Sequence, residues 1–372
     1  MANTNIDILT PEFWAASFES ADYGLYNLHR FVSTKFDNLL ANYGDTVHMP
    51  LVPSLDAADD WVAGDVITSE DITQERIDLI LDTSKKKTIT LNGKELSMSP
   101  YELISTYGAP MAQVILEALN VSIATEMAKA NQVIDGSTLT EDSIVDLKVL
   151  MDNNKCSSVG RNLIMSASDV GSLLKRDAFQ YVQNSADTNA QREGILTRKF
   201  GFNISETHAI ADRAPADLVG AVNNGAGYST GGSTMIVDGF DDDADLIRPG
   251  DRFTVVGDTT KHYVSASSLT TGDTTSITFY PALGGDVLDD AVITFTSSRG
   301  NIALHPSAFG LAMRVYNIIP AGSGVKQTVI NHEGMPIRIS VWHDGKLGIN
   351  IQFDILYGCK LVHQNRIARL VV

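Results

Sequence analysis

The chain has 372 residues, of which 44% are hydrophobic and 20% are charged, and its formal net charge at pH 7 is −17. This length is enough for two or three domains with substantial cores, because single hydrophobic cores stop growing near about 250–300 residues. The ordinary hydrophobic fraction excludes general disorder. The excess of acidic residues argues against nucleic-acid binding through a general positive field, which needs Lys and Arg in excess.

The cysteine count and the hydropathy pattern indicate an intracellular protein. Cys156 and Cys359 are too few for a disulfide framework and suggest a reducing compartment. The first residues have no basic region followed by an apolar run, so no secretory signal is expected. No run of about 18 or more apolar residues occurs, so no membrane span is expected.

Charge is distributed unevenly along the chain. Residues 225–298 contain eleven Asp, no Glu and three basic residues, and residues 45–82 contain ten acidic residues with Arg76 as the one basic residue. A basic run, Lys85–Lys87, follows soon after the acidic segment 45–82. Blocks of opposite sign suit registered contacts between subunits, because complementary charge sets orientation. The alternative interpretation is a set of solvated charged faces.

The first segment, up to about residue 44, has helical spacing in patches. Phe13, Trp14 and Phe18 recur at intervals of about one turn. Pro11 is typical of the first turn of a helix. Either an arm that lies on another molecule or ordinary core packing would explain these aromatic residues.

Residues 45–100 have the composition of strands separated by turns. The runs 77–82 and 88–91 are strand-like, and residues 83–87 are expected to join them. Because this acidic ribbon has few apolar residues, it is expected to gain its stability from a neighbouring element.

The following segment indicates a body of mixed helices and strands. The clearest helix begins near Pro110 and continues to Asn131, with its apolar residues on one broad face. A second helix is expected after Thr140, which is a good N-cap residue. Buried strands are expected at 162–165 and 200–205. This alternation predicts an α+β or α/β body.

The composition changes abruptly near Asn223. Residues 225–298 contain 10 Gly, 12 Thr and 8 Ser, with short strand-like runs between turns. The regular spacing predicts a small all-β domain inserted into the body. After it, strand-like runs at 337–342 and 349–354 flank Asp344-Gly345, which is a hairpin signal.

Motifs that would carry chemistry are weak. The glycines between 225 and 231 resemble a dinucleotide fingerprint but have one residue too many and no strand–helix context. Asp241, Asp243 and Asp245 alternate as in a calcium loop, but Leu246 stands where the turn glycine should be. A solvated acidic turn is therefore favoured over a metal site. The sequence predicts no catalytic set and no cofactor.

Four ordered motifs carry the strongest signal. Arg192–Gly194 reads R-E-G and Gly201–Ile204 reads G-F-N-I; Asn301–Phe309 contains N-x-x-L-H-x-x-A-F, and Asp354–Gly358 reads D-I-L-Y-G. In this order they resemble the R-x-G, G-F-x-(V/I), N-x-x-(F/L)-H-x-x-A-(F/L) and D-x-L-(Y/F)-G motifs of the major capsid proteins of tailed double-stranded-DNA bacteriophages. The similarity is greatest to podophage coat proteins with an inserted β-domain.

The resemblance implies an α+β fold of the tailed-phage major capsid type. The parts that it assigns are an N-terminal arm at 1–47, an extended β-hairpin loop at 48–100, the spine helix of a peripheral domain at 101–135, an axial domain at 136–224, an inserted all-β domain at 225–298, and return strands of the axial and peripheral domains at 299–372.

The resemblance also implies a structural protein, not an enzyme, that self-assembles into the pentamers and hexamers of an icosahedral shell. The shell encloses the phage genome without sequence-specific DNA binding, and an acidic chain suits this because like charge prevents adhesion to phosphate. The implied partners are a scaffolding protein, a portal protein and a possible decoration protein, with assembly in the host cytoplasm and a final location in the virion. The residues expected at contacts between subunits are Trp14, Phe18, Asp59, Asp60, Trp61, Lys85, Lys86 and Lys87.

Two other classes of function stay open. A surface or adhesion protein would use the Thr-, Ser- and Gly-rich β-domain to bind sugar or calcium, but export signals or disulfides would then be expected, and neither is visible. An enzyme of unrecognised type would need a convergent polar pocket, which a sequence does not reveal.

Overall fold

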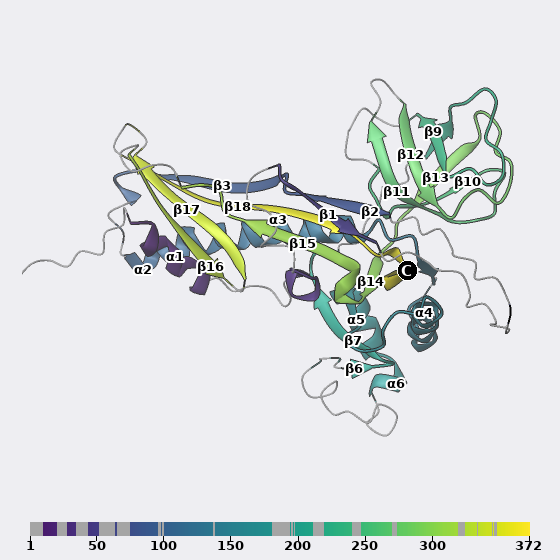
Figure 1. Cartoon of the computed structure of the whole chain (residues 1–372), viewed down its shortest axis with the longest axis horizontal. Helices are drawn as coiled ribbons and strands as arrows, with labels where there is room; N and C mark the ends of the chain where they lie inside the picture. The colour runs from purple at the N-terminus through teal and green to yellow at the C-terminus, as the bar shows by residue number, and fades with distance from the viewer. Residues whose placement is uncertain are drawn as a thin grey trace, which may run out of the picture.

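The computed structural model contains two sheets, a closed barrel and a two-stranded ribbon (Figure 1). The residues that it describes are 10–20, 28–34, 44–51, 64, 75–95, 98, 100–136, 138–180, 194, 196, 198–210, 219–239, 247–269, 274–318, 324–332, 334–343, 345 and 348–372.

The elongated part of the molecule is an antiparallel sheet built around one long strand, β18 (Ile349–Leu361). On one edge, β18 pairs with β3 (Thr83–Leu91). On the other edge it pairs first with β17 (Met335–His343) and then with β15 (Phe309–Arg314). β16 (Val325–His332) extends the sheet beyond β17.

Alternation along β18 gives this sheet an apolar face and a polar face. The odd-numbered residues from 349 to 357 are Ile, Ile, Phe, Ile and Tyr, and all are buried. Asn350, Gln352 and Asp354 alternate with them. Because successive side chains of a strand point to opposite faces, the apolar set faces a helical layer and the polar set faces away from it.

The helical layer consists mainly of α3 (Ala109–Met127), which lies along the sheet (Figure 1). Five of its seven buried residues recur four positions apart, and they share one core cluster with the apolar face of β18; they are Met111, Ile115, Leu119, Ile123 and Met127. Tyr357 of β18 donates a hydrogen bond to Ser122 of α3, with 2.6 Å between the oxygens. The remaining turns of this layer are α1 (Pro11–Ser20), η1 (Leu28–Phe31), α2 (Pro100–Leu103) and the π-helical η4 (Ile104–Gly108).

The long helix predicted from Pro110 to Asn131 is confirmed, but it ends four residues early, at Met127. The backbone N–H of Asn131 donates to the side chain of Gln364 at 3.1 Å instead of continuing the helical pattern. This tertiary hydrogen bond directs the chain into β4 (Val133–Asp135).

The second sheet has six strands and lies beside one end of the first (Figure 1). Its order is β4, β19 (Ile367–Val371), β14 (Gly300–Leu304), β5 (Asn162–Ser166), β7 (Phe202–Thr207) and β6 (Arg198–Lys199). The β5–β7 and β4–β19 pairs are parallel, and the other pairs are antiparallel. The predicted strands at 162–165 and 200–205 are therefore confirmed, with shifted ends.

Three helices accompany the second sheet: α4 (Glu141–Asn153), α5 (Ala167–Leu174) and α6 (Asp177–Gln180). Thr140 caps α4, and its side chain accepts a hydrogen bond from the backbone of Ser143 at 3.2 Å, as expected for a helix that starts there. Ser166 caps α5 in the same way through the backbone of Asp169. These caps fix where each helix leaves its preceding segment.

A closed antiparallel barrel lies between β7 and β14 along the chain. Its strands are β8 (Val219–Val222), β9 (Thr234–Asp238), β10 (Arg252–Val255), β11 (His262–Leu269), β12 (Thr275–Tyr280) and β13 (Val292–Thr296). Its centre is filled by aromatic rings: the Phe253 ring centroid lies 5.4 Å from those of both Phe279 and Phe295. A core filled in this way stabilises the barrel by burying apolar area.

The barrel begins earlier in the chain than the change in composition near Asn223 indicates. β8 pairs with both β9 and β13, so it is a barrel strand, although its sequence Val-Gly-Ala-Val has no excess of Thr, Ser or Asp. The composition changes only in the connection that follows β8. Strand pairing, which composition does not report, determines where the barrel begins.

A two-stranded ribbon of β1 (Thr46–Pro50) and β2 (Arg76–Ile80) crosses the polar side of the elongated sheet. The apolar residues Met49 and Leu79 of the ribbon pack on the sheet. The small cluster that they form also contains Leu81, Ala312, Leu356 and Val362. The described part of this segment therefore takes its packing partners from the same chain. The backbone of Ile80 passes so close to Gly358 that a Cβ there would lie 2.1 Å from the Ile80 carbonyl oxygen.

One predicted connection is wrong: residues 83–87, expected to join two strands, are themselves the first part of β3. Three consecutive lysines are typical of a solvated loop, but each of these residues pairs with a residue of β18. The strand is held by its partner rather than by its own composition.

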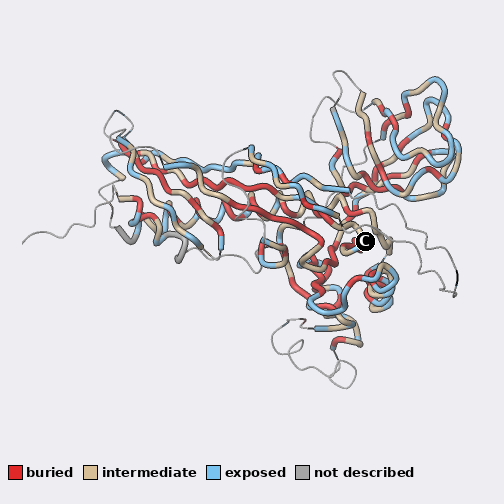
Figure 2. The backbone as a smooth tube through the Cα atoms, in the orientation of Figure 1, coloured by how far each residue is buried: buried red, intermediate tan, exposed pale blue. Residues whose placement is uncertain are grey.

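The buried residues run through the middle of the elongated sheet and into the second sheet, whereas the outer strands and loops are exposed (Figure 2). Among the residues that the structure describes, no helix is long and apolar enough to cross a membrane.

We predict that Gly358→Ala destabilises the protein, because the added methyl group would overlap the backbone of Ile80 and push the ribbon away from the sheet. The expected loss is about 1–3 kcal/mol in the free energy of unfolding, measured by chemical denaturation.

Gly171→Ala is the matched control, since Gly171 lies within α5 and a Cβ there meets nothing within 4 Å. Alanine has a higher helix propensity than glycine, so no loss of stability is expected for this variant. Equal stability of the two variants would contradict the close approach at Gly358.

Candidate assembly surfaces

β3 forms an exposed edge of the elongated sheet. In the part of the chain that the structure describes, β3 pairs with β18 alone, so its other edge has unpaired backbone groups. Lys85, Lys86 and Lys87 are all exposed on this strand. Edge strands that carry lysine resist unspecific pairing with other strands, while a partner of opposite charge can still approach.

Lys86 belongs to a row of charged residues across the polar face of the sheet. Its register partner on β18 is Asp354, which is opposite Arg338 on β17. Arg338 donates to both carboxylate oxygens of Asp354, at 2.9 Å from Nη2 and 3.0 Å from Nε. Gln352 donates to the same carboxylate at 2.9 Å. Because the Asp354 side chain is only 2% exposed, these donors are what make its burial possible.

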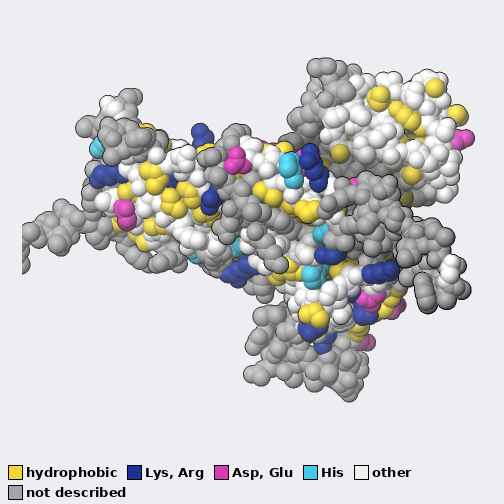
Figure 3. Space-filling view, in the orientation of Figure 1, with side chains coloured by type: hydrophobic (Ala, Val, Ile, Leu, Met, Phe, Trp, Pro, Cys, Tyr) yellow, Lys and Arg dark blue, Asp and Glu magenta, His cyan; other side chains and the backbone are white. Residues whose placement is uncertain are grey.

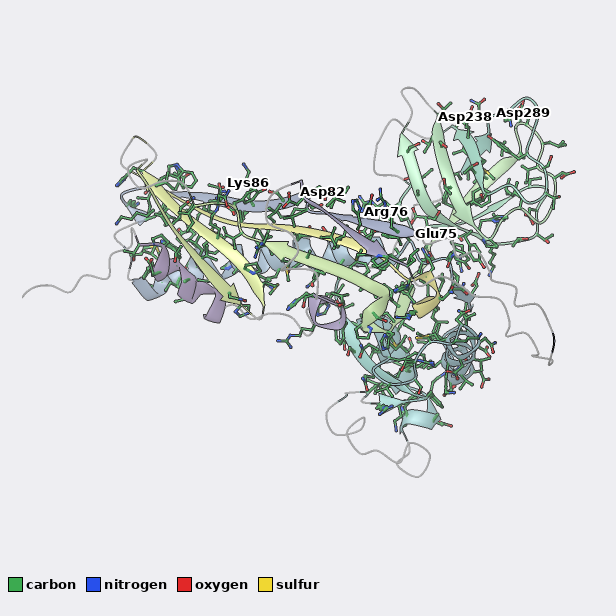
Figure 4. All side chains as sticks on the ribbon, in the orientation of Figure 1. Glu75, Arg76, Asp82, Lys86, Asp238 and Asp289 are labelled. Atoms are coloured by element: carbon green, nitrogen blue, oxygen red, sulfur yellow. The ribbon has the colours of Figure 1, made fainter. Side chains whose placement is uncertain are left out.

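The charged residues near the ribbon alternate in sign. Glu75, Arg76, Asp82 and Lys86 follow one another along one rim of the molecule (Figure 4).

Asp78 of β2 also forms an exposed pair with His48 of β1, and the hydrogen bond from His48 lowers the pKa of Asp78 below its ordinary value. Figure 3 shows hydrophobic side chains on the same face of the elongated part, between groups of Lys or Arg and of Asp or Glu. Such a mixed rim suits a contact that must be specific.

Few of the predicted contact residues can be placed on this surface. Trp14 is fully buried in the core beside α3, and its ring packs edge-on against Phe13 at 5.2 Å. Of the two interpretations of the first segment, core packing is therefore the one found for Trp14. The side chain of Phe18 and the whole of Asp59, Asp60 and Trp61 lie outside the described residues, as do the metal candidates Asp241, Asp243 and Asp245.

The first residue of the N-x-x-L-H motif organises a buried polar network. Asn301 of β14 is completely buried; its side-chain oxygen accepts from the backbone of Ser166, and its amide donates to Asp169 at 2.7 Å. Arg299 lies 3.4 Å from the other carboxylate oxygen of Asp169. Asn301 thus joins β14 to the start of α5. Its role is structural, because buried polar groups must be paired.

The D-I-L-Y-G motif is used in the same way. Asp354 binds Arg338, Leu356 packs under the ribbon, Tyr357 binds Ser122 of α3, and Gly358 leaves room for Ile80. Four of the five positions therefore join β18 to three neighbours: β17, the ribbon and α3. Sequence reasoning did not single out Arg338, whose position opposite Asp354 depends on the register of β17 and β18.

The barrel is attached to the second sheet by a cluster of charges around Asp135 of β4. Arg252 and Lys261 of the barrel lie 3.3 Å and 2.9 Å from its carboxylate, and the Tyr263 hydroxyl donates to it at 2.7 Å. Burial disfavours the charged form, but these donors outweigh that effect and lower the pKa of Asp135. Arg369 of β19 extends toward the barrel and donates to the carbonyl of Gly250 at 2.9 Å. The barrel is thus docked by polar contacts.

No site for a metal ion is found among the described residues, since they contain no suitable group of three or more His, Cys, Asp or Glu. The two cysteines are free thiols; burial raises the pKa of Cys359 to about 12 and also raises that of Cys156. Buried thiols with a raised pKa are typical of packing residues rather than nucleophiles.

No protein-family model and no curated protein matches the chain. A chain of the solved structure titled "Mycobacterium phage Che8" is similar to it, with a TM-score of 0.54 and 14% identity over 94% of this chain and 92% of that one. A chain of "Capsid structure of the Cyanophage P-SCSP1u" has a TM-score of 0.49 and 11% identity, with 94% and 89% covered. A chain of "Asymmetric unit of bacteriophage PhiM1 mature capsid" has a TM-score of 0.47 and 11% identity, with 87% and 81% covered.

The likeness to the Che8 chain spans nearly the whole of both chains. It confirms the α+β fold that the resemblance to tailed-phage major capsid proteins implies. At 14% identity it establishes the fold and leaves the role of single residues to the geometry of this chain.

We predict that Asp354→Asn destabilises the protein by about 2–3 kcal/mol, because Arg338 then loses its charged partner in a site where the carboxylate is 2% exposed. Thermal and chemical unfolding followed by circular dichroism measure the loss.

Asp78→Asn removes the same charge from an exposed pair and serves as the control. No measurable loss is expected for it, because solvent screens exposed ion pairs. A loss of similar size in both variants would contradict a special role of the buried pair.

Proposed function

We propose that this protein is the major capsid protein of a tailed double-stranded-DNA phage, of the podophage type with an inserted β-domain. It acts as a structural subunit without catalytic activity, and copies of it form the pentamers and hexamers of an icosahedral shell. The observation that carries the proposal is the likeness of the whole chain to a chain from a phage structure, over 94% and 92% of the two lengths. The order of the four sequence motifs supports it independently.

The arrangement of the described elements fits this role. We assign the N-terminal arm to 1–47, the extended loop to 48–100, the peripheral domain to α3 with the strands β15 to β18, and the axial domain to the second sheet. The barrel is the inserted domain: β7 and β14, which precede and follow it, both pair with β5. The chain therefore leaves the second sheet, forms the barrel and returns to the same sheet.

Contacts between copies are expected to combine opposite charges. The exposed lysines of β3 are complementary to the acidic segment 45–82, in which Asp59 and Asp60 immediately precede Trp61. We propose that the lysines of one copy face the acidic segment of a neighbouring copy. Each such contact is weak by itself, but many of them in a closed shell add through multivalency.

The partners that follow from this role are a scaffolding protein, a portal protein and a possible decoration protein. The shell is assembled in the host cytoplasm and encloses DNA in the virion. The net charge of −17 fits this arrangement, since an acidic wall does not adhere to the phosphate backbone.

Negative-stain electron microscopy of the expressed chain, alone and with a scaffolding protein, tests the function. Closed shells or isolated pentamers and hexamers are expected. Monomers at every concentration, with and without scaffold, would contradict the proposal.

We predict that Lys85→Gln, Lys86→Gln and Lys87→Gln together reduce shell yield several-fold while the subunit still folds, because all three side chains are exposed. Sedimentation separates shells from free subunits, and circular dichroism reports folding. Replacement of Lys94, Lys155 and Lys175 by Gln changes the net charge equally at exposed positions away from the lysine run and should leave the yield unchanged.

A charge exchange sharpens this prediction. Lys85→Glu with Lys86→Glu should abolish assembly, and adding Asp59→Lys with Asp60→Lys should restore it in part, because complementarity returns with reversed sign. If the exchange restored no shells, the proposal that Asp59 and Asp60 face the lysines of a neighbouring copy would be contradicted.

A further inference from the structure

A buried aspartate–histidine pair links two connections of the barrel. Asp258 lies in the connection between β10 and β11, and His262 is the first residue of β11. Nε2 of His262 lies 3.2 Å from Oδ2 of Asp258. The side chains of His262 and Asp258 are 0% and 2% exposed, so each of their hydrogen bonds needs a partner within the protein.

Asp258 accepts hydrogen bonds at both carboxylate oxygens. The backbone N–H and the hydroxyl of Thr260 donate to Oδ1 at 2.8 Å and 2.7 Å, and the backbone N–H of Gly284 donates to Oδ2 at 2.6 Å. Burial raises the pKa of Asp258, but these bonds and the neighbouring His262 outweigh burial and lower the pKa to about 2. Asp258 is therefore ionised near neutral pH, and an ionised carboxylate only accepts hydrogen bonds.

Both ring nitrogens of His262 face such acceptors. Nε2 faces the Asp258 carboxylate, and Nδ1 lies 2.8 Å from the carbonyl oxygen of Pro281. A neutral imidazole has one N–H group, so in that form one of the two nitrogens would direct its lone pair at an oxygen. The imidazolium has an N–H group at each nitrogen and makes both bonds. The contacts of His262 therefore require the protonated ring.

Two aromatic rings of the barrel core lie beside His262. Phe253, its register partner on β10, has its ring centroid 5.3 Å away at an interplanar angle of 31°. The centroid of Phe279 is 5.0 Å away at 71°. A cation within about 6 Å of an aromatic face is attracted to that face, so Phe253 also favours the protonated ring.

The other charged groups on these elements have their own partners. Arg252 of β10 and Lys261, which precedes β11, both bind Asp135 of β4. Asp286, in the connection between β12 and β13, accepts from the backbone and the hydroxyl of Thr230. Within the described part of the chain, the buried histidine thus has the aspartate of the pair as its counter-charge.

The two connections that the pair links also touch through their backbones. A Cβ on Gly285 would lie 2.7 Å from the carbonyl oxygen of Gly257, and a Cβ on Gly257 would lie 2.9 Å from that of Asp286. The bonds of the pair to Gly284 and Pro281 span the same two connections. The pair therefore holds a close contact between the β10–β11 and β12–β13 connections.

We propose that His262 is an imidazolium in the folded chain at neutral pH and that, with Asp258, it forms a clasp between these two connections that weakens in alkali. Loss of the proton would remove one hydrogen bond of the ring and leave the buried Asp258 without its counter-charge. An unfolded histidine releases its proton near about pH 6.5, whereas the folded ring retains it. The stabilisation by the clasp is therefore complete below that pH and declines as the pH rises above it.

Nuclear magnetic resonance of the unassembled full-length chain, labelled with ¹⁵N-histidine, tests the charge of the ring whether or not the chain forms shells. At about pH 7.5 both ring nitrogens of His262 should carry protons, and the signal should be absent from His262→Gln. If that variant does not fold, variants of the seven other histidines assign the signal by elimination. A ring with one protonated nitrogen at this pH would overturn the proposal.

Hydrogen exchange of the same chain tests the clasp. Between about pH 6 and about pH 8.5, the protection of peptides covering 252–256 and 262–269 should fall at least about tenfold in the wild type relative to His262→Gln, because only the unfolded histidine loses its proton in this range. His208→Gln, at an exposed position outside the barrel, is the matched control and should follow the wild type. A constant ratio between the wild type and His262→Gln across this range would contradict the clasp.

Discussion

The structure depends on one strand, β18, which contacts other elements at both edges and on both faces. β18 is 13 residues long, so one edge is long enough for β3 while the other holds β17 and β15 one after the other. Its apolar face carries the long helix α3, and its polar face carries the Arg338–Asp354 pair and the crossing ribbon. Since a strand alternates strictly, a shift of one residue would turn Ile, Phe and Tyr to the polar side and bury Asp354 without partners.

The residues that identify the fold from sequence have structural roles in this chain rather than chemical ones. Asn301 and Asp354 are both buried polar residues whose partners come from other segments. Such networks are costly when they are incomplete, so they fix one arrangement of sheets and helices. Gly358 fixes another feature, the closeness of the ribbon to the sheet, because it has no Cβ.

Long-range pairing explains why the candidate surfaces were only partly predictable. The exposed lysines of β3 were expected at a contact, and their exposure on an edge strand agrees with that expectation without testing it. Trp14 was expected there too, but its ring fills the core beside α3. Its aromatic character indicates burial without saying against which surface. The bonds between η5 (Pro306–Ala308) and η6 (Gln364–Arg366) were not predicted, because they join segments that are distant in the chain and meet only when both sheets form.

The sequence by itself determined the elements that rest on local rules: the start of α4 at its Thr140 cap, the position of α3 from its apolar spacing, the buried strand β5 and the hairpin of β17 and β18. The order of the motifs also determined the fold class. Only the tertiary structure decided that 83–87 is a strand, that β8 belongs to the barrel and that α3 ends at Met127. In each of these cases a distant segment supplies the hydrogen bonds that hold the backbone, and the local composition does not indicate that partner.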